Sequence, residues 1–397
     1  MKIGLVNLVT KSSEILSEPA TIVRQSDLAP GSDAGLNIVE MGRRMASCGN
    51  DVQVIVADAF KPRDPMPSEN RLRIEYLPTR MTWAFPPALA PFTPSLGRYL
   101  RDQKLDVVQF GELFQPATVL GWLDSHASDV KMFVWQELDV LMRSPVGYVQ
   151  TGYYRTLGKL VAKKCSSLIP RSISARNHLT RHGMSEEKIS PVVHSGVDTT
   201  LFRQLNREEC RARFGVEDRE AVILAVARLD PIKGLDLLIQ AMTEVSKELP
   251  SSILVIQGNG PAYPALKSLV GHLGLEDHVK FITESFPHNR MPALYNIADV
   301  LAVTSRIDLF PFVAIEAISC GVPLVTSFSR GLKTDIVDKG GGIMLSQESK
   351  AMGNAIVSFL QDRRELDQIG RRARLLAVED FDFEVCSQRL LRIYEGI

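Results

Sequence analysis

The chain has few cysteines for its length, and their spacing gives them no evident structural use. Five occur among 397 residues, an odd number, and no two form a Cys-x-x-Cys pair. Scattered single cysteines argue against a disulfide framework and against a zinc site. We therefore expect a protein of a reducing compartment, the cytoplasm. The cysteines are Cys48, Cys165, Cys210, Cys320 and Cys386.

A long hydrophobic segment is also missing. A transmembrane helix needs roughly 20 apolar residues in succession, and every apolar run here is shorter. The first residues read as a short apolar strand followed by the polar run Lys11 to Glu14, without the core and cleavage site of a signal peptide. The expected location is cytoplasmic, either soluble or peripheral at the inner membrane face.

Neither sign of charge is in excess. Lys+Arg and Asp+Glu both number 46, so no global basic field points to nucleic acid. Binding of a phosphate group must then depend on where single cations lie. With 45% hydrophobic and 23% charged residues the chain reads as an ordinary globular protein. Its length suggests about two or three domains.

Short apolar runs alternate with amphipathic windows, which is the pattern of parallel α/β layers. In the first half, strands are expected at 2–8, 52–57, 72–77, 107–110, 132–136, 167–169 and 189–193. Helices are expected near 36–47, 94–103, 115–125, 150–164 and 174–182. A second series has strands at 221–227, 253–257, 279–282, 300–303, 322–326 and 342–345. Its helices are expected near 234–248, 262–273, 290–297, 313–319, 331–337, 350–360 and 364–376.

This alternation predicts the α/β class, with two Rossmann-like doubly wound domains that face each other across a cleft. The boundary is placed near 199–215, beside a charged helix at 207–213, which gives one domain of residues 1–200 and another of 201–379. Ligands of such sheets bind at the carboxyl ends of the strands. Loops that follow strands are therefore the places to search for a site.

Two cations follow the first strand of the second half. Arg228 and Lys233 lie in the loop Ala-Arg-Leu-Asp-Pro-Ile-Lys-Gly, which opens a helix. Such a pair can bind a diphosphate and neutralise it as it leaves. The alternative is two solvated side chains on a surface loop. A Gly-Asn-Gly turn from Gly258 to Gly260 follows the next strand, and alone it indicates only a tight turn.

Two carboxylates lie eight residues apart in Asp-Leu-Phe-Pro-Phe-Val-Ala-Ile-Glu. Pro311 suits the first turn of a helix that Gly321 ends, so Asp308 is expected in the preceding loop and Glu316 about two turns along the helix. The loop carboxylate and the first-turn N–H groups would face one crevice, where phosphate or polyhydroxyl groups can bind. The alternatives are a helix N-cap for Asp308 and an exposed helical position for Glu316.

In order and spacing these segments resemble the nucleotide-sugar-binding half of the GT-B glycosyltransferases, specifically the retaining group called family 4. The resemblance is strong in the second half and weaker in the first. It rests on Arg228-Leu-(x3)-Lys233-Gly, Gly258-Asn-Gly-Pro, Pro292-Ala-Leu-Tyr295-(x2)-Ala-Asp299 and Asp308-(x7)-Glu316-Ala-(x2)-Cys-Gly-Val-Pro. The closing stretch 380–397 resembles the terminal helix by which these enzymes return to the first domain.

The resemblance implies roles for the residues of the second half. Arg228 and Lys233 would hold the diphosphate of the donor, with Gly258 beside it, and Glu316 would accept hydrogen bonds from ribose hydroxyls. Asp308 would lie near hydroxyls of the donor sugar, at a position where the family usually has the longer Glu. The backbone donors would follow Asp308. Pro311 has no N–H group, which leaves Phe310, Phe312 and Val313.

The first half departs from the family pattern at two positions. A Gly-Gly loop is expected after the first strand to approach the donor phosphate, and Ala34-Gly35 keeps only the second glycine. Asn37 follows as an acceptor-side candidate, the alternative being a surface helical Asn. Gln136 stands where many members have a histidine near the reacting carbon. Glu137 or Asp139 could act there instead, or no side chain acts as a base.

A metal and a membrane were weighed as partners. His178 and His182 are spaced i, i+4 on an expected helix, as two ligands could be, but no third ligand and no Asp-x-Asp motif is evident, so no metal is expected. Basic residues recur among apolar ones along 150–164. This helix face is either solvated or a contact with an anionic membrane that carries a lipid-linked acceptor. The basic residues are Arg155, Lys159, Lys163 and Lys164.

The predicted function is a metal-independent, retaining glycosyltransferase, a hexosyltransferase. It would move a sugar from a nucleoside-diphosphate sugar, with no other cofactor, to a hydroxyl of a glycan, a lipid-linked or a small polar acceptor. Two alternatives stay open: a nucleotide-sugar epimerase or hydrolase of the same fold, and a non-catalytic nucleotide-sugar-binding protein. An NAD-dependent oxidoreductase is disfavoured because no Gly-x-Gly-x-x-Gly follows the first strand.

Overall fold

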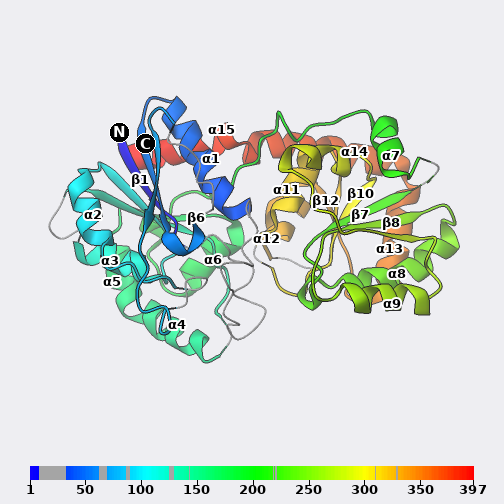
Figure 1. Ribbon diagram of the computed structural model, residues 1–397, viewed down its shortest axis with the longest axis horizontal. Helices are drawn as coiled ribbons and strands as arrows, with labels where there is room; N and C mark the ends of the chain where they lie inside the picture. The colour runs from blue at the N-terminus through cyan, green and yellow to red at the C-terminus, as the bar shows by residue number, and fades with distance from the viewer. Residues whose placement is uncertain are drawn as a thin grey trace. The chain divides into compact units, whose positions relative to one another are not determined.

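The computed structural model of the chain divides into two compact units. Unit 1 comprises Met1–Gly196 and Phe383–Ile397, and unit 2 comprises Val197–Asp382. The structure describes residues 1–8, 33–61, 69–85, 90–124, 129–142, 144–217, 219, 221–308, 310–327 and 330–397. Much of the long polar loop between the first strand and the first helix therefore lies outside the described residues. Each unit is one parallel sheet with helices on its faces (Figure 1).

Unit 1 is built on a six-stranded sheet in the order β3-β2-β1-β4-β5-β6, and every paired strand runs parallel to its neighbour. Fully buried strands of this kind read as near-continuous apolar runs, which is why they could be found in the sequence. The strands are β1 (Lys2–Val6), β2 (Asp51–Ala57), β3 (Leu72–Leu77), β4 (Val107–Gly111), β5 (Lys131–Gln136) and β6 (Ser167–Pro170).

Helices cover both faces of this sheet. Against one face pack α1 (Asp33–Ser47) and the closing helix α15 (Phe383–Glu395), with Met41, Met45 and Leu390 in one apolar cluster. The other face buries side chains of α2 (Leu96–Gln103), α3 (Pro116–Asp124), α4 (Val146–Arg155), α5 (Leu157–Lys164) and α6 (Ile173–Arg181). The chain thus contributes its last helix to the core of the unit that contains its first strand.

Unit 2 repeats the plan with the strand order β12-β11-β10-β7-β8-β9. Its strands are β7 (Val222–Val226), β8 (Ile253–Gln257), β9 (Val279–Ile282), β10 (Val300–Val303), β11 (Leu324–Thr326) and β12 (Gly342–Met344). One face is covered by α7 (Arg207–Phe214), α10 (Met291–Tyr295), α11 (Phe312–Ser319), α12 (Arg330–Leu332) and α14 (Arg363–Leu376). The other is covered by α8 (Leu235–Glu248), α9 (Tyr263–His272) and α13 (Ser349–Gln361).

Three expected elements differ in the structure. The run 189–193 is not a strand: Ile189 forms only an isolated bridge with Leu168, and Pro191 has no N–H group to continue a ladder. The expected helix 150–164 is two helices, α4 and α5, which meet at Thr156 with φ −124° and ψ −98°. The hydroxyl of Thr156 bonds the Gly152 carbonyl at 2.8 Å, which competes with the helix. The expected helix 331–337 is α12 followed by a π-helical turn, Lys333–Val337.

Both sheets are doubly wound, as the alternation predicted. In each, the chain fills one side of the first strand and then returns to build the other side, so the strand order reverses between β1 and β4 in unit 1 and between β7 and β10 in unit 2. At such a switch point the two loops leaving the carboxyl ends diverge and leave a crevice that can receive a ligand. Two places in the fold are thereby set apart for function.

Candidate functional site

The loop after β7 carries the two predicted cations of unit 2. Asp230 accepts a hydrogen bond from the Ile232 N–H at 3.1 Å and so caps a short 3₁₀ turn that ends at Lys233. Its other carboxylate oxygen lies 2.6 Å from Nη2 of Arg228, whose side chain is 45% exposed. One carboxylate therefore shapes the loop and orients Arg228, the more exposed of the two cations.

Lys233 forms an ion pair with Asp308 across the switch point. Its Nζ lies 2.8 Å from Asp308 Oδ2, and the two side chains are only 16% and 7% exposed. The hydroxyl of Ser305 donates to the same carboxylate oxygen at 3.1 Å. Asp308 is thus bound to Lys233 and does not cap α11, whose N-cap is Pro311 without a side-chain hydrogen bond. The sequence named both residues but not their contact.

The two loops that carry this pair are fastened to each other. Gly234 has φ +63°, and a Cβ there would clash with the Thr304 carbonyl oxygen, so only glycine permits this close approach. The Thr304 hydroxyl donates to the carbonyl oxygens of Lys233 and Gly234 at 3.2 and 3.1 Å. Arg306 adds two bonds to Asp236, at 2.8 and 2.7 Å. The ion pair is therefore held in place by backbone contacts, as an electrostatic site requires.

The glycine turn after β8 lies beside the β7 loop. Gly258 has φ +144°, and a Cβ there would clash with the carbonyl oxygen of Ala227. The Leu229 N–H donates to the Asn259 carbonyl at 2.9 Å, and the Ala262 N–H donates to the Leu229 carbonyl at 2.9 Å. The predicted Gly258 is thus needed for close packing of two loops at the carboxyl edge of the sheet, which places its turn next to Arg228.

The segment after Asp308 turns into α11. Phe310 is buried and its ring stacks on Phe381 with centroids 5.9 Å apart, so its side chain belongs to the core. Phe312 and Val313 are the first two residues of α11. Backbone N–H groups of a first helical turn have no acceptor inside the helix and point out of its end. The predicted backbone donors Phe312 and Val313 therefore lie at a helix start, and Phe310 lies two residues before that helix.

Glu316 is a buried carboxylate, 7% exposed, and not a surface glutamate. The Tyr295 hydroxyl donates to its Oε2 at 2.5 Å, and Nε2 of His288 lies 3.1 Å from its Oε1. The helix begins at Phe312, so Glu316 lies about one turn along it, where two turns were predicted. A carboxylate offers about four lone-pair sites. Two are used here, which leaves acceptor capacity for ligand hydroxyls.

Taken together, unit 2 presents two cations, two buried carboxylates and a helix start at the carboxyl ends of β7, β8 and β10. The cations suit a diphosphate, since guanidinium and ammonium groups form charge-assisted bonds with phosphate oxygens. The carboxylates suit hydroxyl donors. Of the residues that take part, His288, Ser305 and Arg306 were not found from sequence, although each follows a strand and could have been examined on that ground.

In unit 1 the predicted glycine loop is a helix. Gly35 lies in the first turn of α1, which begins at Asp33. An acidic residue at a helix start and Ala34 in place of a glycine both favour the helix. Asn37 follows in α1, and its Nδ2 donates to the Gly196 carbonyl at 3.4 Å. Its Oδ1 is buried without a hydrogen-bond partner among the described residues. Asn37 is therefore a half-buried polar side chain with one acceptor to spare.

Gln136, at the end of β5, is fully buried and bound to a glutamate that sequence reasoning missed. Both amide protons are used, on Glu112 Oε2 at 2.7 Å and on the Leu138 carbonyl at 2.9 Å. Glu112 follows β4, and its Oε1 accepts the N–H groups of Glu137 and Leu138, each at 2.7 Å. Gln136 thus helps to anchor the loop after β5. The position of Glu112 directly after a strand was the available signal.

Burial sets the charge state of this anchor. It raises the pKa of Glu112 to about 8, and the neighbouring charge of Glu137 acts in the same direction. The backbone donors of Leu138 and Glu137, together with Arg171, act against that rise. Glu112 also has φ +70°, in the region that non-glycine residues seldom adopt. A half-buried glutamate with a positive backbone φ thus lies at the switch point of unit 1.

The other first-half candidates belong to the same neighbourhood. Glu137 forms an ion pair with Arg171, which is almost completely buried. Asp139 is buried and accepts a hydrogen bond from the Ser174 hydroxyl at 2.5 Å. The rings of His178 and His182 lie 4.5 Å apart and pack on Tyr154. Across the part of the chain that the structure describes, no group of three or more His, Cys, Asp or Glu residues is arranged to hold a metal ion.

Comparison with known proteins bears on both units. Residues 206–376 match the family model described as glycosyl transferases group 1. The chain is 30% identical over 244 residues to a D-inositol 3-phosphate glycosyltransferase of Segniliparus rotundus, covering 60% of this chain and 54% of that protein. It is 32% identical over 211 residues to a GDP-mannose-dependent alpha-(1-6)-phosphatidylinositol monomannoside mannosyltransferase of Mycolicibacterium smegmatis, covering 51% and 55%. The chain therefore spans about half the length of these relatives.

Solved structures share the fold over the whole chain. The Anabaena protein Alr3699/HepE in complex with UDP has a TM-score of 0.77 at 19% identity, with both chains fully covered. A sucrose-phosphate synthase from Thermosynechococcus elongatus has a TM-score of 0.76 at 19% identity, covering 100% of this chain and 98% of that one. The predicted arrangement of two doubly wound domains, GT-B, is confirmed. No helix of the described residues is long and apolar enough to cross a membrane.

Proposed function

Because residues 206–376 form a glycosyl transferases group 1 domain within a GT-B fold, we propose that the chain is a retaining glycosyltransferase of the family 4 type. It transfers a hexose from a nucleoside-diphosphate sugar to a hydroxyl acceptor. The observation that carries this proposal is the contact of Lys233 with Asp308, 2.8 Å apart at the switch point of unit 2. A relative named for its dependence on GDP-mannose and a fold neighbour bound to UDP support a nucleotide-sugar donor.

In this proposal Arg228 and Lys233 bind the diphosphate. As the bond between the anomeric carbon and the β-phosphate oxygen breaks, negative charge grows on that phosphate, and preorganised cations stabilise it. The acceptor oxygen bonds to the anomeric carbon on the same face, and its proton passes to the departing phosphate. Side chains supply the compensating charge, so we propose that no metal and no further cofactor takes part.

The carboxylates of unit 2 then bind the two sugars of the donor. Asp308 accepts from Lys233 and Ser305 through one oxygen, and a carboxylate, with about four lone-pair sites, can also accept from a hydroxyl of the transferred hexose. Glu316 accepts from ribose hydroxyls with the lone pairs that Tyr295 and His288 leave. The N–H groups at the start of α11 donate to phosphate or sugar oxygens. One ligand with a phosphate and two polyhydroxyl parts satisfies all of these groups.

We propose that the acceptor binds at the carboxyl edge of the unit 1 sheet. Its acceptor-side residues are Asn37, with a free oxygen, and the loop after β5, which begins at Glu137. The relatives named for inositol 3-phosphate and for a phosphatidylinositol mannoside support a polyol, free or lipid-linked, as the acceptor. In this site Gln136 orients the loop through Glu112 and does not act as a base.

For a lipid-linked acceptor we further propose a peripheral contact with an anionic membrane through α4 and α5, on the cytoplasmic side. Tyr148, Val149 and Leu160 are 77%, 65% and 57% exposed. Exposed basic residues accompany them, a combination that binds headgroups and acyl chains together. Sedimentation with phosphatidylglycerol vesicles tests this: reversing two charges (Lys159→Glu with Lys163→Glu) should release the protein, whereas equal binding of the variant would contradict it. The basic residues are Arg155, Lys159, Lys163 and Lys164.

One mass-spectrometric experiment tests the function. The protein is incubated with UDP- and GDP-hexoses, with and without inositol, inositol 3-phosphate or phosphatidylinositol vesicles. We expect a new glycoside together with stoichiometric nucleoside diphosphate, only when an acceptor is present. Rapid donor consumption without a glycoside would support a hydrolase or epimerase instead. Tight nucleotide binding without turnover on any acceptor would support a non-catalytic binding protein.

A further inference from the structure

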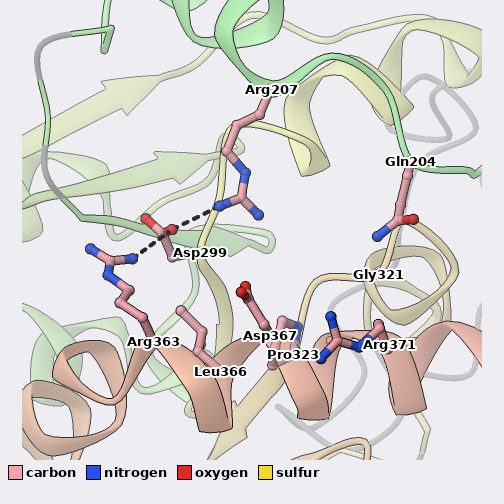
Figure 2. A pocket seen from close by; sticks show the side chains of 10 residues that line it. Gln204, Arg207, Asp299, Gly321, Pro323, Arg363, Leu366, Asp367 and Arg371 are labelled. Carbon is pink, nitrogen blue, oxygen red and sulfur yellow. Dashed lines mark hydrogen bonds and ion pairs between the residues drawn. The ribbon is translucent and has the colours of Figure 1, made fainter.

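A polar hollow lies at the amino edge of the unit 2 sheet, opposite the edge that carries Lys233. It has a volume of about 260 Å³. Asp299, directly before β10, and the turn Gly321–Pro323, directly before β11, lie on one side, and α14 lies on the other. Figure 2 shows arginines on several sides of it, with Arg207 from α7 and Arg363 and Arg371 from α14.

Asp299 anchors this hollow and leaves it an excess of positive charge. The carboxylate is 2% exposed and is bound by Arg211 Nη2 at 2.7 Å and by the Val222 N–H at 2.8 Å. Arg207 and Arg363 also contact it, through one nitrogen each, at 3.0 and 3.2 Å. One buried negative charge thus meets three guanidinium groups, and each guanidinium has five N–H donors. Most of the donors of Arg207 remain available to a ligand.

Three other groups at the hollow are unpaired among the residues that the structure describes. Within the described ranges, the side chains of Gln204, Asp367 and Arg371 form no hydrogen bond or ion pair, although all three line the hollow. Asp367 lies between Arg363 and Arg371 on successive turns of α14 (Figure 2). An Arg and an Asp at i, i+4 would ordinarily pair. Here Asp367 and Arg371 do not pair with each other, so both can bind a ligand in the hollow.

One wall of the hollow is formed where α14 packs closely against the backbone of the turn at Gly321. A Cβ on Gly370 of α14 would lie 2.7 Å from the Gly321 carbonyl oxygen, and Gly321 itself has φ +74°. Gly370 is buried, and α14 is held there by Leu366, Ala373 and Leu376, which are all in the cores. Arg363, Asp367 and Arg371 therefore project from one rigid helix with a fixed spacing. That spacing is what distinguishes a site from a set of solvated side chains.

We propose that this hollow binds a phosphorylated polyol, a small molecule with a phosphate monoester and free hydroxyls. The phosphate is bound by Arg371, Arg207 and the Gln204 amide, since guanidinium groups match phosphate oxygens in pairs. Asp367 cannot contact an anion favourably, and it accepts instead from a hydroxyl of the same molecule. The site is separate from the donor site and does not depend on the proposed transfer reaction.

Calorimetry on the full chain with glucose 6-phosphate, inorganic phosphate and glucose tests the proposal. We expect glucose 6-phosphate to bind once per chain at the hollow. Arg371→Ala should weaken that binding at least tenfold, and Arg371→Lys less, because an ammonium group lacks the guanidinium fork. Asp367→Asn should weaken binding of glucose 6-phosphate but not of inorganic phosphate. Arg364→Ala, an exposed arginine of the same helix outside the hollow, should change nothing.

Four results would overturn it. Glucose 6-phosphate could fail to bind in the millimolar range. Inorganic phosphate could bind as tightly as glucose 6-phosphate, which would remove the role of Asp367. Arg364→Ala could weaken binding as much as Arg371→Ala, which would indicate a general effect of positive charge. Binding could be lost in Lys233→Ala and kept in Arg371→Ala, which would assign it to the donor site. Arg371 is exposed, so its substitution should not unfold the protein. A melting curve of each variant checks this.

Discussion

Lys233 Nζ lies 2.8 Å from Asp308 Oδ2, and this ion pair joins the loop after β7 to the loop after β10 at the point where the strand order of unit 2 reverses. The pair is mostly buried, and breaking such a pair leaves an uncompensated charge. Burying both charges also costs solvation energy that their attraction does not always repay, which favours a functional reason for the pair. A departing diphosphate on Lys233 and a sugar hydroxyl on Asp308 supply such a reason.

Removing the charge of Asp308 should affect nucleotide binding and hexose transfer differently. In Asp308→Asn the cation at Lys233 is no longer neutralised, so UDP or GDP should bind at least as tightly as to the wild type. Turnover of the nucleotide sugar should fall tenfold or more, because the hexose hydroxyl then bonds a neutral amide oxygen in place of a charged carboxylate oxygen, which is the stronger hydrogen-bond acceptor. Asp308→Glu, with the residue that the family usually has, should keep turnover within tenfold. Calorimetry and steady-state kinetics measure both; weaker UDP and GDP binding with unchanged turnover would reverse the assignment.

Glu316 should determine recognition of the ribose. We expect Glu316→Ala to weaken UDP and GDP at least tenfold and to leave their 2′,3′-dideoxy forms unaffected, since a lost charged hydrogen bond costs about 1.5–3 kcal/mol. Tyr295→Phe removes one donor to Glu316 and keeps its carboxylate, so it is the matched control and should retain the preference for ribose. Equal loss of both nucleotide forms in Glu316→Ala would mean that the residue acts only through folding.

Gly258 should be needed for the fold of unit 2. Gly258→Ala places a Cβ against the Ala227 carbonyl at φ +144°, whereas Gly274→Ala has φ +64° and no atom within 4 Å. The control should cost about 1–2 kcal/mol for the left-handed backbone, and Gly258→Ala more. Circular dichroism follows unfolding of the whole chain. All three tryptophans lie in unit 1, so their fluorescence transition should not move. Equal stability of the two variants would refute the steric argument.

Glu112 should make unit 1 less stable as the pH rises. Its pKa is raised from 4.5 to about 8 in the folded chain, so between these values the folded state binds the proton and the unfolded state has released it. The contribution is present below pH 4.5 and is lost as the pH rises towards 8. In urea titrations followed by tryptophan fluorescence, Glu112→Gln should remove a stability loss of a few kcal/mol, and Glu395→Gln should not. Identical pH slopes in wild type and Glu112→Gln would contradict this.

The sequence was informative about the fold because both sheets are parallel and buried. Their strands are short apolar runs, and the helices between them have clear periodicity. The failures have local causes. Pro191 interrupts a run that otherwise reads as a strand. Thr156, which lies between Gly152 and Gly158, divides the expected helix into two. In the stretch before Asn37, the family pattern predicted a loop at a position where Ala34 favours a helix.

The site was predicted as a set of residues but not as a set of contacts. Arg228, Lys233, Asp308 and Glu316 were found from their spacing, yet the partners of Lys233 and Glu316 are 75 and 21 residues away along the chain. Such contacts depend on the strand order of the sheet, and a local sequence pattern does not predict that order. Glu112 was missed for the same reason, since only the pairing of β4 with β5 brings it to Gln136.

The turnover of Lys233→Ala is the most direct measurement of the central claim, that Lys233 stabilises a departing diphosphate. Lys247→Ala is the matched control, because Lys247 lies near the far end of α8, the helix that follows the same loop, is 65% exposed and contacts only Glu244 among the described residues. With the donor and acceptor found by mass spectrometry, we expect Lys233→Ala to be slower by about 10²-fold or more and Lys247→Ala to equal the wild type. A folded Lys233→Ala variant with wild-type turnover would contradict the account.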